Sequence, residues 1–144
     1  MPNLTGQLKS SDTMQTLASL NDTPGHQLLL SVSHSRQTSS DSLFNNIHHS
    51  AWGTTDLHNG SGHQHGYFAN EHADGDRSFG TYECNVSTVN GQLTMEGHWK
   101  FTNGTGQFAG ISGNGTFKAQ LTSPTTSEAS FEGSYQVKSG IRAA

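Results

Sequence analysis

The sequence is poor in the residues that would build a covalent framework, a membrane span or a nucleic-acid surface. It contains one cysteine, Cys84, so no disulfide can form within the chain. Charged residues make up 12% of the chain, about half of the usual share. The seven Lys and Arg residues are scattered, without the basic stripe that neutralises phosphates, and no segment approaches the roughly 20 apolar residues of a membrane helix. These absences argue against nucleic acid and against a membrane as partners.

The first residues do not have the pattern of an export signal. The first residues, MPNLTGQLKSSDTMQ, lack both a basic n-region and an apolar h-region, so we expect no signal peptide. A lone cysteine is typical of proteins from a reducing compartment. Together the two features predict a cytoplasmic protein.

Glycine and small polar residues take the place of the missing apolar and charged ones. Apolar residues are only 30% of the chain, whereas glycine occurs 17 times. Low hydrophobicity favours disorder when it comes with high net charge, but the net charge here is only −4. The 144 residues suit a single domain with its own core. The composition favours a glycine-rich all-β domain.

Apolar and polar residues alternate with a period of two through most of the chain, which indicates strands. Residues 1–25 are polar, and we expect a loosely held arm with a first short strand. The segment 43–62 is ambiguous, and GQFAG within 103–115 predicts one short helical turn. About seven or eight antiparallel strands joined by tight turns predict one closed β-barrel over 1–144, because closure removes exposed edges. The other expected strands are 26–34, 63–72, 77–87, 93–102, 116–122 and 128–137.

The hairpin formed by 63–72 and 77–87 decides which side chains face the barrel interior. A two-residue Asp74–Gly75 turn would pair Tyr67 with Tyr82. Because side chains alternate across a strand, this register places one polar and aromatic set on the inner face. That set is His63, His65, Tyr67, Glu71, Tyr82 and Cys84. The remaining histidines of this region and its neighbours are expected at the surface: His48, His49, His58, His72 and His98.

Aromatic residues of the later strands complete the predicted interior. A concave and mostly apolar wall with a few polar groups is typical of a small-molecule site. We therefore predict a ligand-binding wall made of His34, Cys84, Trp99, Phe101, Phe117, Phe131 and Tyr135.

His63 and His65 are the predicted acid–base groups of this interior. Imidazoles titrate near neutrality and can move a proton on a bound molecule. Tyr67 and Tyr82 would donate hydrogen bonds to a developing oxyanion, and Glu71 would orient a histidine. The sequence thus favours a cyclase, isomerase or lyase that needs no cofactor and acts on a small hydrophobic or amphipathic molecule.

Other interpretations stay open at this level. The same pocket would serve a ligand carrier without enzymatic activity, and a barrel filled by its own side chains would be structural. His63, His65 and His34 would give three imidazoles, a pattern of catalytic zinc sites. The favoured interpretation contains no metal, because the H-x-H pattern lacks the second half that cupin metal sites have. A homo-oligomer, dimer or trimer, is also left open.

The segment FTNGTGQFAGISGNGTFKAQ, residues 101–120, resembles small bacterial proteins of the allene oxide cyclase-like β-barrel superfamily. GYFANEHADGDRSFGTYE (66–83) resembles their strand–DGD–strand hairpin, and FEGSY (131–135) resembles their closing strand. The shared residues are mostly glycines and core aromatics, so the resemblance implies the barrel rather than any catalytic residue. Members include cyclases of fatty-acid-derived epoxides and of natural products, which makes cyclisation an implied activity.

Overall fold

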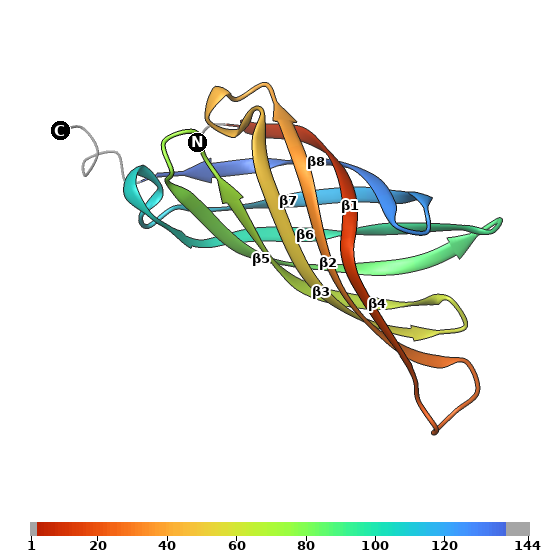
Figure 1. Ribbon diagram of the computed structural model, residues 1–144. Coiled ribbons are helices and arrows are strands. Elements are labelled where there is room, and N and C mark those ends of the chain that lie inside the picture. The colour runs from red at the N-terminus through yellow and green to blue at the C-terminus, as the bar shows by residue number, and fades with distance from the viewer. Residues whose placement is uncertain (1–2, 138–144) are drawn as a thin grey trace.

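The chain forms a closed antiparallel barrel of eight strands, as the sequence predicted (Figure 1). The computed structural model describes residues 3–137. Each strand pairs with its neighbours in the chain, and β8 closes the barrel against β1. The elements are β1 (Asn3–Ser19), β2 (His26–Ser39), the 3-10 turn η1 (Ser42–Phe44), β3 (Ile47–His58), β4 (Ser61–Glu71), β5 (Arg77–Val89), β6 (Gln92–Gly104), the 3-10 turn η2 (Gly106–Phe108), β7 (Ser112–Ser123) and β8 (Thr126–Gln136).

Residues 3–19 form a full strand, so the expectation of a loosely held arm was wrong for the described part of 1–25; residues 1–2 lie outside the described residues. β1 has 17 residues and pairs with β2 on one side and β8 on the other. Leu4 is buried on its inner face, and Leu8 lines the interior further along. Beyond Asp12 the strand leaves the barrel with β2 as a projecting hairpin, where both faces meet solvent. The polar composition of that hairpin therefore does not prevent strand pairing.

Two expectations for the connections can be judged directly. The ambiguous segment 43–62 holds η1 and then a single strand, β3, which turns into β4 at Asn59–Gly60. Asn59 and Gly60 have φ angles of 54° and 85°, as a two-residue hairpin turn of this kind requires. The short helical turn expected at GQFAG is confirmed as η2.

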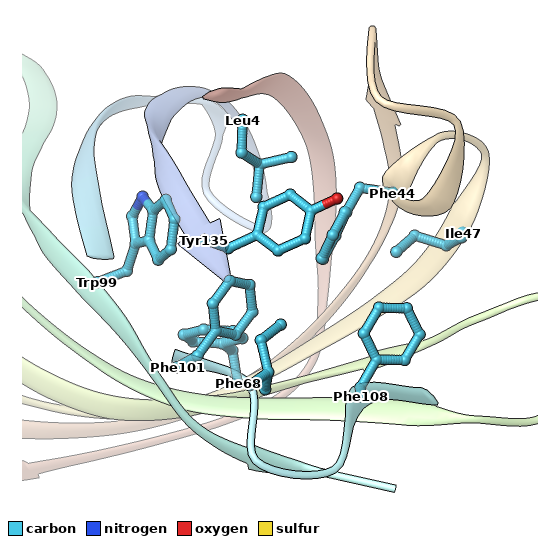
Figure 2. Close-up of a cluster of buried hydrophobic side chains, with 9 residues drawn as sticks. Leu4, Phe44, Ile47, Phe68, Trp99, Phe101, Phe108 and Tyr135 are labelled. Atoms are coloured by element: carbon cyan, nitrogen blue, oxygen red, sulfur yellow. The ribbon is translucent and has the colours of Figure 1, made fainter. Parts of the chain in front are cut away.

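The two ends of the barrel differ. At one end lie η1, η2 and the β4–β5 loop, whereas the tips of the β1–β2, β3–β4, β5–β6 and β7–β8 hairpins splay apart at the other (Figure 1). Aromatic side chains fill the first end (Figure 2). The Phe44 ring is fully buried and lies 5.8 Å from the rings of Phe101 and Phe108 and 4.9 Å from that of Tyr135. We call the first end the closed end and the other the mouth.

Two carboxylates fix the connections of the closed end. Asp41 accepts hydrogen bonds from the Leu43 N–H at 3.0 Å and from the Tyr135 hydroxyl at 2.6 Å. Asp76 accepts one from the Gln107 N–H at 3.1 Å and so ties the β4–β5 loop to η2. The closed end is thereby held by polar bonds around an aromatic centre.

The β4–β5 hairpin has a register one residue away from the predicted one. Glu71 pairs with Arg77, and Tyr82 lies opposite Gly66 rather than Tyr67. The His72 carbonyl accepts from the Gly75 N–H at 3.0 Å, and the His72 N–H donates to the Asp76 carbonyl at 2.8 Å. The loop therefore holds three residues, 73–75, with Gly75 at φ 83° in the left-handed region.

This one-residue shift turns β4 over relative to β5. Side chains alternate with period two, so an odd shift moves every residue of one strand to the other face. The inner face of β4 carries Gln64, Phe68 and Asn70, and His72, the residue after the strand, is also buried. On β5 the prediction holds, because Tyr82 and Cys84 face inward. The β4 residues predicted inside are on the outer wall: His63, His65, Tyr67 and Glu71.

Candidate functional site in the barrel interior

Between the closed end and the mouth, the barrel holds a cavity of 140 Å³. Aromatic and aliphatic side chains make up most of its wall, and the described residues around it include no Asp, Glu, Lys or Arg. The polar groups that reach it are amides, hydroxyls and one imidazole. The residues that line it are Leu4, Leu8, Ser10, Ser33, Gln37, Phe44, His49, Ala51, Gln64, Phe68, Asn70, Tyr82, Met95, Trp99, Phe101, Phe117, Ala119, Ser127, Ala129 and Phe131.

Glycines across from the large rings give the cavity its shape. A Cβ atom on Gly66 would stand 2.5 Å from the Tyr82 ring, and one on Gly115 would stand 2.5 Å from the Trp99 indole. Each ring therefore approaches the backbone of a neighbouring strand at a position that carries no side chain. The glycine-rich composition thus positions the two largest polar aromatics of the interior.

A chain of hydrogen bonds runs from the closed end to the cavity. The Leu43 carbonyl accepts from His72 Nδ1 at 2.7 Å. Because a carbonyl oxygen can only accept, Nδ1 carries the hydrogen, and Nε2 of neutral His72 accepts from the Ser78 hydroxyl at 2.9 Å. Ser78 in turn accepts from the Asn70 amide at 3.1 Å. The Asn70 oxygen then accepts from His49 Nδ1 at 2.8 Å.

This hydrogen-bond chain fixes the tautomer of His49, and burial fixes its protonation state. Burial lowers the pKa of His72, which favours the neutral ring that the chain needs. Burial also lowers the pKa of His49 to about 4. His49 is therefore uncharged at neutral pH, with its hydrogen on Nδ1 and a lone pair on Nε2, and no side chain of residues 3–137 bonds Nε2. The cavity wall presents one hydrogen-bond acceptor that can also accept a proton.

Tyr82 supplies a hydrogen-bond donor to the cavity at a different position along the barrel from His49. Burial raises its pKa, so the phenol keeps its proton. Its hydroxyl lies over Gly53, where a side chain would collide with it. Gly53 is four residues from His49 on β3, which corresponds to about 13 Å along the strand. The two groups are therefore too far apart to contact the same atom of a ligand.

Several predicted site residues do lie in the interior. Trp99, Phe101, Phe117 and Phe131 line the cavity. Tyr135 is buried in the closed end, where its hydroxyl bonds Asp41. Cys84 is also interior, but it packs with Leu57 and Val86 beside the cavity, and burial raises its pKa to about 12. Cys84 is thus a protonated core thiol.

The remaining predicted residues are not in the cavity. His63, His65, Tyr67 and Glu71 are on the outer wall because of the three-residue loop, and Tyr67 is 67% exposed. His34 is on the outer face of β2, where its ring stacks on His48 at 5.2 Å and bonds the Ser50 hydroxyl at 3.0 Å. The acid–base pair predicted at His63 and His65 therefore cannot act inside the barrel.

Sequence reasoning missed His49, the imidazole that reaches the cavity, and His72, which supports it through the hydrogen-bond chain. His49 and His72 were expected at the surface and are inner-wall residues. For His49 a signal was present in the alternation Ile47-x-His49-x-Ala51-x-Gly53, which places it on the same face as a buried isoleucine. For His72 the face depended on the register of the hairpin loop, which the Asp-Gly pair did not specify.

Comparison with known proteins leaves the family of the chain open. No protein-family model matches the sequence, and no curated protein matches it either. Among residues 3–137 there is no helix long and apolar enough to cross a membrane. What the structure shows is the architecture, a closed eight-stranded antiparallel barrel.

Proposed function

We propose that the barrel interior binds a small, uncharged and mostly apolar molecule that donates one hydrogen bond to His49 Nε2. The observation that carries this proposal is the cavity itself, with apolar walls, no charged lining residue and a neutral imidazole of fixed tautomer. An apolar pocket with few polar groups is the usual form of a small-molecule site. A charged ligand would lose hydration there without gaining a counter-ion.

The volume of the cavity limits the ligand. At 140 Å³ it is close to an engineered apolar cavity of about 150 Å³ that binds benzene. A single aromatic ring or a short aliphatic chain fits this space. The Trp99, Phe101 and Phe117 rings would contact an aromatic ligand edge to face or offset. A wider or branched molecule would require the mouth to open further.

Phenol, toluene and benzoate together test this proposal, with binding measured by NMR titration of the labelled protein at neutral pH. Phenol and toluene should both perturb cavity resonances, and benzoate should not. One net hydrogen bond contributes about 0.5–1.5 kcal/mol. The ratio of the affinity for phenol to that for toluene should therefore be roughly two- to tenfold higher in the unaltered protein than in His49→Leu. Failure of all three compounds to perturb cavity residues would show a barrel that admits no ligand.

A substitution that fills the cavity provides the matched control. Ala129→Leu adds three carbons to the cavity wall and should abolish binding of phenol and toluene. Ala73→Leu adds the same atoms to the exposed β4–β5 loop and should leave binding unchanged. Equal binding by the two variants would place the ligand outside the barrel.

Acid–base catalysis is the second candidate, and the hydrogen-bond chain behind His49 favours it. A base with a fixed tautomer in a dry site is suited to removing a proton from a bound molecule. The proposal keeps the sequence-based expectation of a cofactor-independent cyclase, isomerase or lyase, but replaces His63 and His65 with His49. Because Tyr82 lies about 13 Å away along the strand direction, it has no role in proton transfer at His49 in this proposal.

The ring opening of 5-nitrobenzisoxazole separates this candidate from simple binding. A base takes the C3 proton of this uncharged compound, the N–O bond breaks, and a coloured cyanophenolate forms. Catalysis by His49 predicts a kcat/KM that is lost in His49→Leu and that declines only near pH 4, where Nε2 becomes protonated. An unchanged rate in His49→Leu, or a decline near pH 6.5, would contradict a catalytic role for this imidazole.

The broader expectations remain proposals. A relationship to allene oxide cyclase-like barrels is supported by the closed eight-stranded architecture and by the resemblance in residues 101–120. A cytoplasmic location and a dimeric or trimeric state are predictions from the sequence alone. The cavity supports a small molecule, rather than nucleic acid or a membrane, as the binding partner.

A further inference from the structure

The outer wall brings His63, His65 and Glu83 together on β4 and β5. His65 and Glu83 are directly opposite in the strand pairing, and His63 is on the same face of β4 two residues away. Glu83 Oε2 lies 3.7 Å from His65 Nδ1 and 4.0 Å from His63 Nε2. The two imidazole centroids are 4.5 Å apart. All three potential ligand atoms lie within 4.8 Å of one another.

We propose that His63, His65 and Glu83 bind one divalent transition-metal ion of the Zn²⁺ class. Zn²⁺ takes imidazole nitrogen and carboxylate oxygen at about 2.0–2.2 Å, which places tetrahedral ligand atoms about 3.3 Å apart. Small rotations of these solvent-accessible side chains close the remaining gap. Two imidazoles and one carboxylate leave a fourth position for water or a further ligand, as open zinc and iron sites do.

Asn85 prepares His63 for this role. Its amide oxygen lies 3.2 Å from His63 Nδ1. An amide oxygen can only accept, so Nδ1 carries the hydrogen and the lone pair is on Nε2, the nitrogen that faces Glu83. A hydrogen bond on the second ring nitrogen is the usual support of a metal-binding histidine. The backbones of β4 and β5 are paired on both sides, which holds the four residues in place.

A neighbouring group of similar composition is already occupied by its own bonds. His26, Asp56 and His58 also lie close enough together for a metal. However, His26 bonds Asp22 through Nδ1 at 2.8 Å and Asp56 through Nε2 at 2.6 Å. Both carboxylate oxygens accept, so both ring nitrogens of His26 carry hydrogens in this arrangement and neither has a free lone pair. A metal there would have to displace a proton and two hydrogen bonds, and we assign the site to His63, His65 and Glu83.

The surroundings leave room at the open coordination position. His65 and Glu83 line an outer groove of 800 Å³ whose wall includes the exposed rings of Trp52 and Tyr67. Water or a small ligand can therefore reach a metal from this side. The barrel wall separates this site from the cavity, so the metal proposal does not depend on the proposed function of the interior.

Zinc titration of the full chain without a histidine tag, freed of metal by EDTA and followed by calorimetry, tests the proposal. The expected result is one Zn²⁺ per chain. Asn85→Ala should weaken binding by about 10–100-fold, and His63→Ala or His65→Ala should weaken it more. His58→Ala is the matched control and should bind as the unaltered chain does. The metal-free protein should unfold cooperatively, because the ligands are on the surface of a fully paired sheet.

Three results would overturn this assignment. One is the absence of stoichiometric Zn²⁺ binding. Another is loss of binding in His58→Ala with retention in His63→Ala, which would move the site to the His26 group. The third is equal affinity in His63→Ala, His65→Ala and the unaltered chain. Circular dichroism of each variant confirms that the barrel is intact before the titration is interpreted.

Discussion

The inner and outer walls of the barrel give histidine opposite properties. On the inner wall, burial lowers the pKa of His49 and His72, and both rings are neutral members of a hydrogen-bond chain. On the outer wall, His26 lies between Asp22 and Asp56, and the bond to Asp22 is the main cause of its raised pKa. The face of the strand, and with it the access of water and carboxylates, therefore decides what a histidine does in this protein.

The largest expected difference is in how much a buried and an exposed aromatic residue contribute to the stability of the fold. Phe44 is fully buried among other rings at the closed end, so Phe44→Ala should lower the free energy of unfolding by about 3–5 kcal/mol. Tyr67 is 67% exposed on the outer wall, and Tyr67→Ala should change stability by less than about 0.5 kcal/mol. Urea unfolding of both variants measures the difference. Similar losses for the two would mean that the closed end is not the stabilising core.

Serines on the two faces of β5 give a smaller contrast. Ser78 is fully buried and links His72 to Asn70, so Ser78→Ala leaves buried polar partners unsatisfied. The expected cost is about 1–3 kcal/mol. Ser87 lies on the exposed outer face of the same strand, and Ser87→Ala should be close to neutral. If Ser78→Ala were equally neutral in thermal unfolding, the hydrogen-bond chain would not exist in solution.

The fold was predictable because alternation and turn residues agree with each other along most of the chain. Two of the four Asn-Gly pairs, Asn59–Gly60 and Asn90–Gly91, form two-residue turns in which both residues have a positive φ angle. At Asp74–Gly75 only the glycine adopts a positive φ, and the loop gains a residue. Asp76, the residue after this pair, accepts a hydrogen bond from η2. The sequence marks a turn here without specifying its length.

The candidate site was predictable only where a residue's face did not depend on that loop. Trp99, Phe101, Phe117 and Phe131 were placed correctly, because their strands alternate clearly. His63 and His65 were misplaced by the single extra residue. The chain from Leu43 to His49 joins η1, β3, β4 and β5, so no local pattern could reveal it.

Stability should respond to pH with opposite signs for the two walls. The lowered pKa of His49 contributes stability that is present above its unfolded value of 6.5 and is lost as the pH falls toward about 4. As the pH falls from 6.5 to about 4, the unaltered chain should therefore lose unfolding free energy relative to His49→Gln. The raised pKa of His26 contributes stability that is present below pH 6.5 and is lost as the pH rises above it. As the pH rises, the unaltered chain should therefore lose unfolding free energy relative to His26→Gln. Denaturant midpoints measured from pH 4 to 8 provide the test, and slopes of the same sign would contradict it.

The contrast between the walls is tested most directly by the ring nitrogens of the histidines. Long-range ¹H–¹⁵N correlation spectra, recorded from pH 8 to 4, report the charge and the tautomer of each imidazole. The account predicts that His49 keeps a protonated Nδ1 and a bare Nε2 down to about pH 5, since its pKa is about 4. His26, whose pKa is raised by its bond to Asp22, should still be mostly doubly protonated at pH 6.5. A His49 ring that gains its second proton near pH 6.5, or that carries its hydrogen on Nε2, would contradict the proposed site.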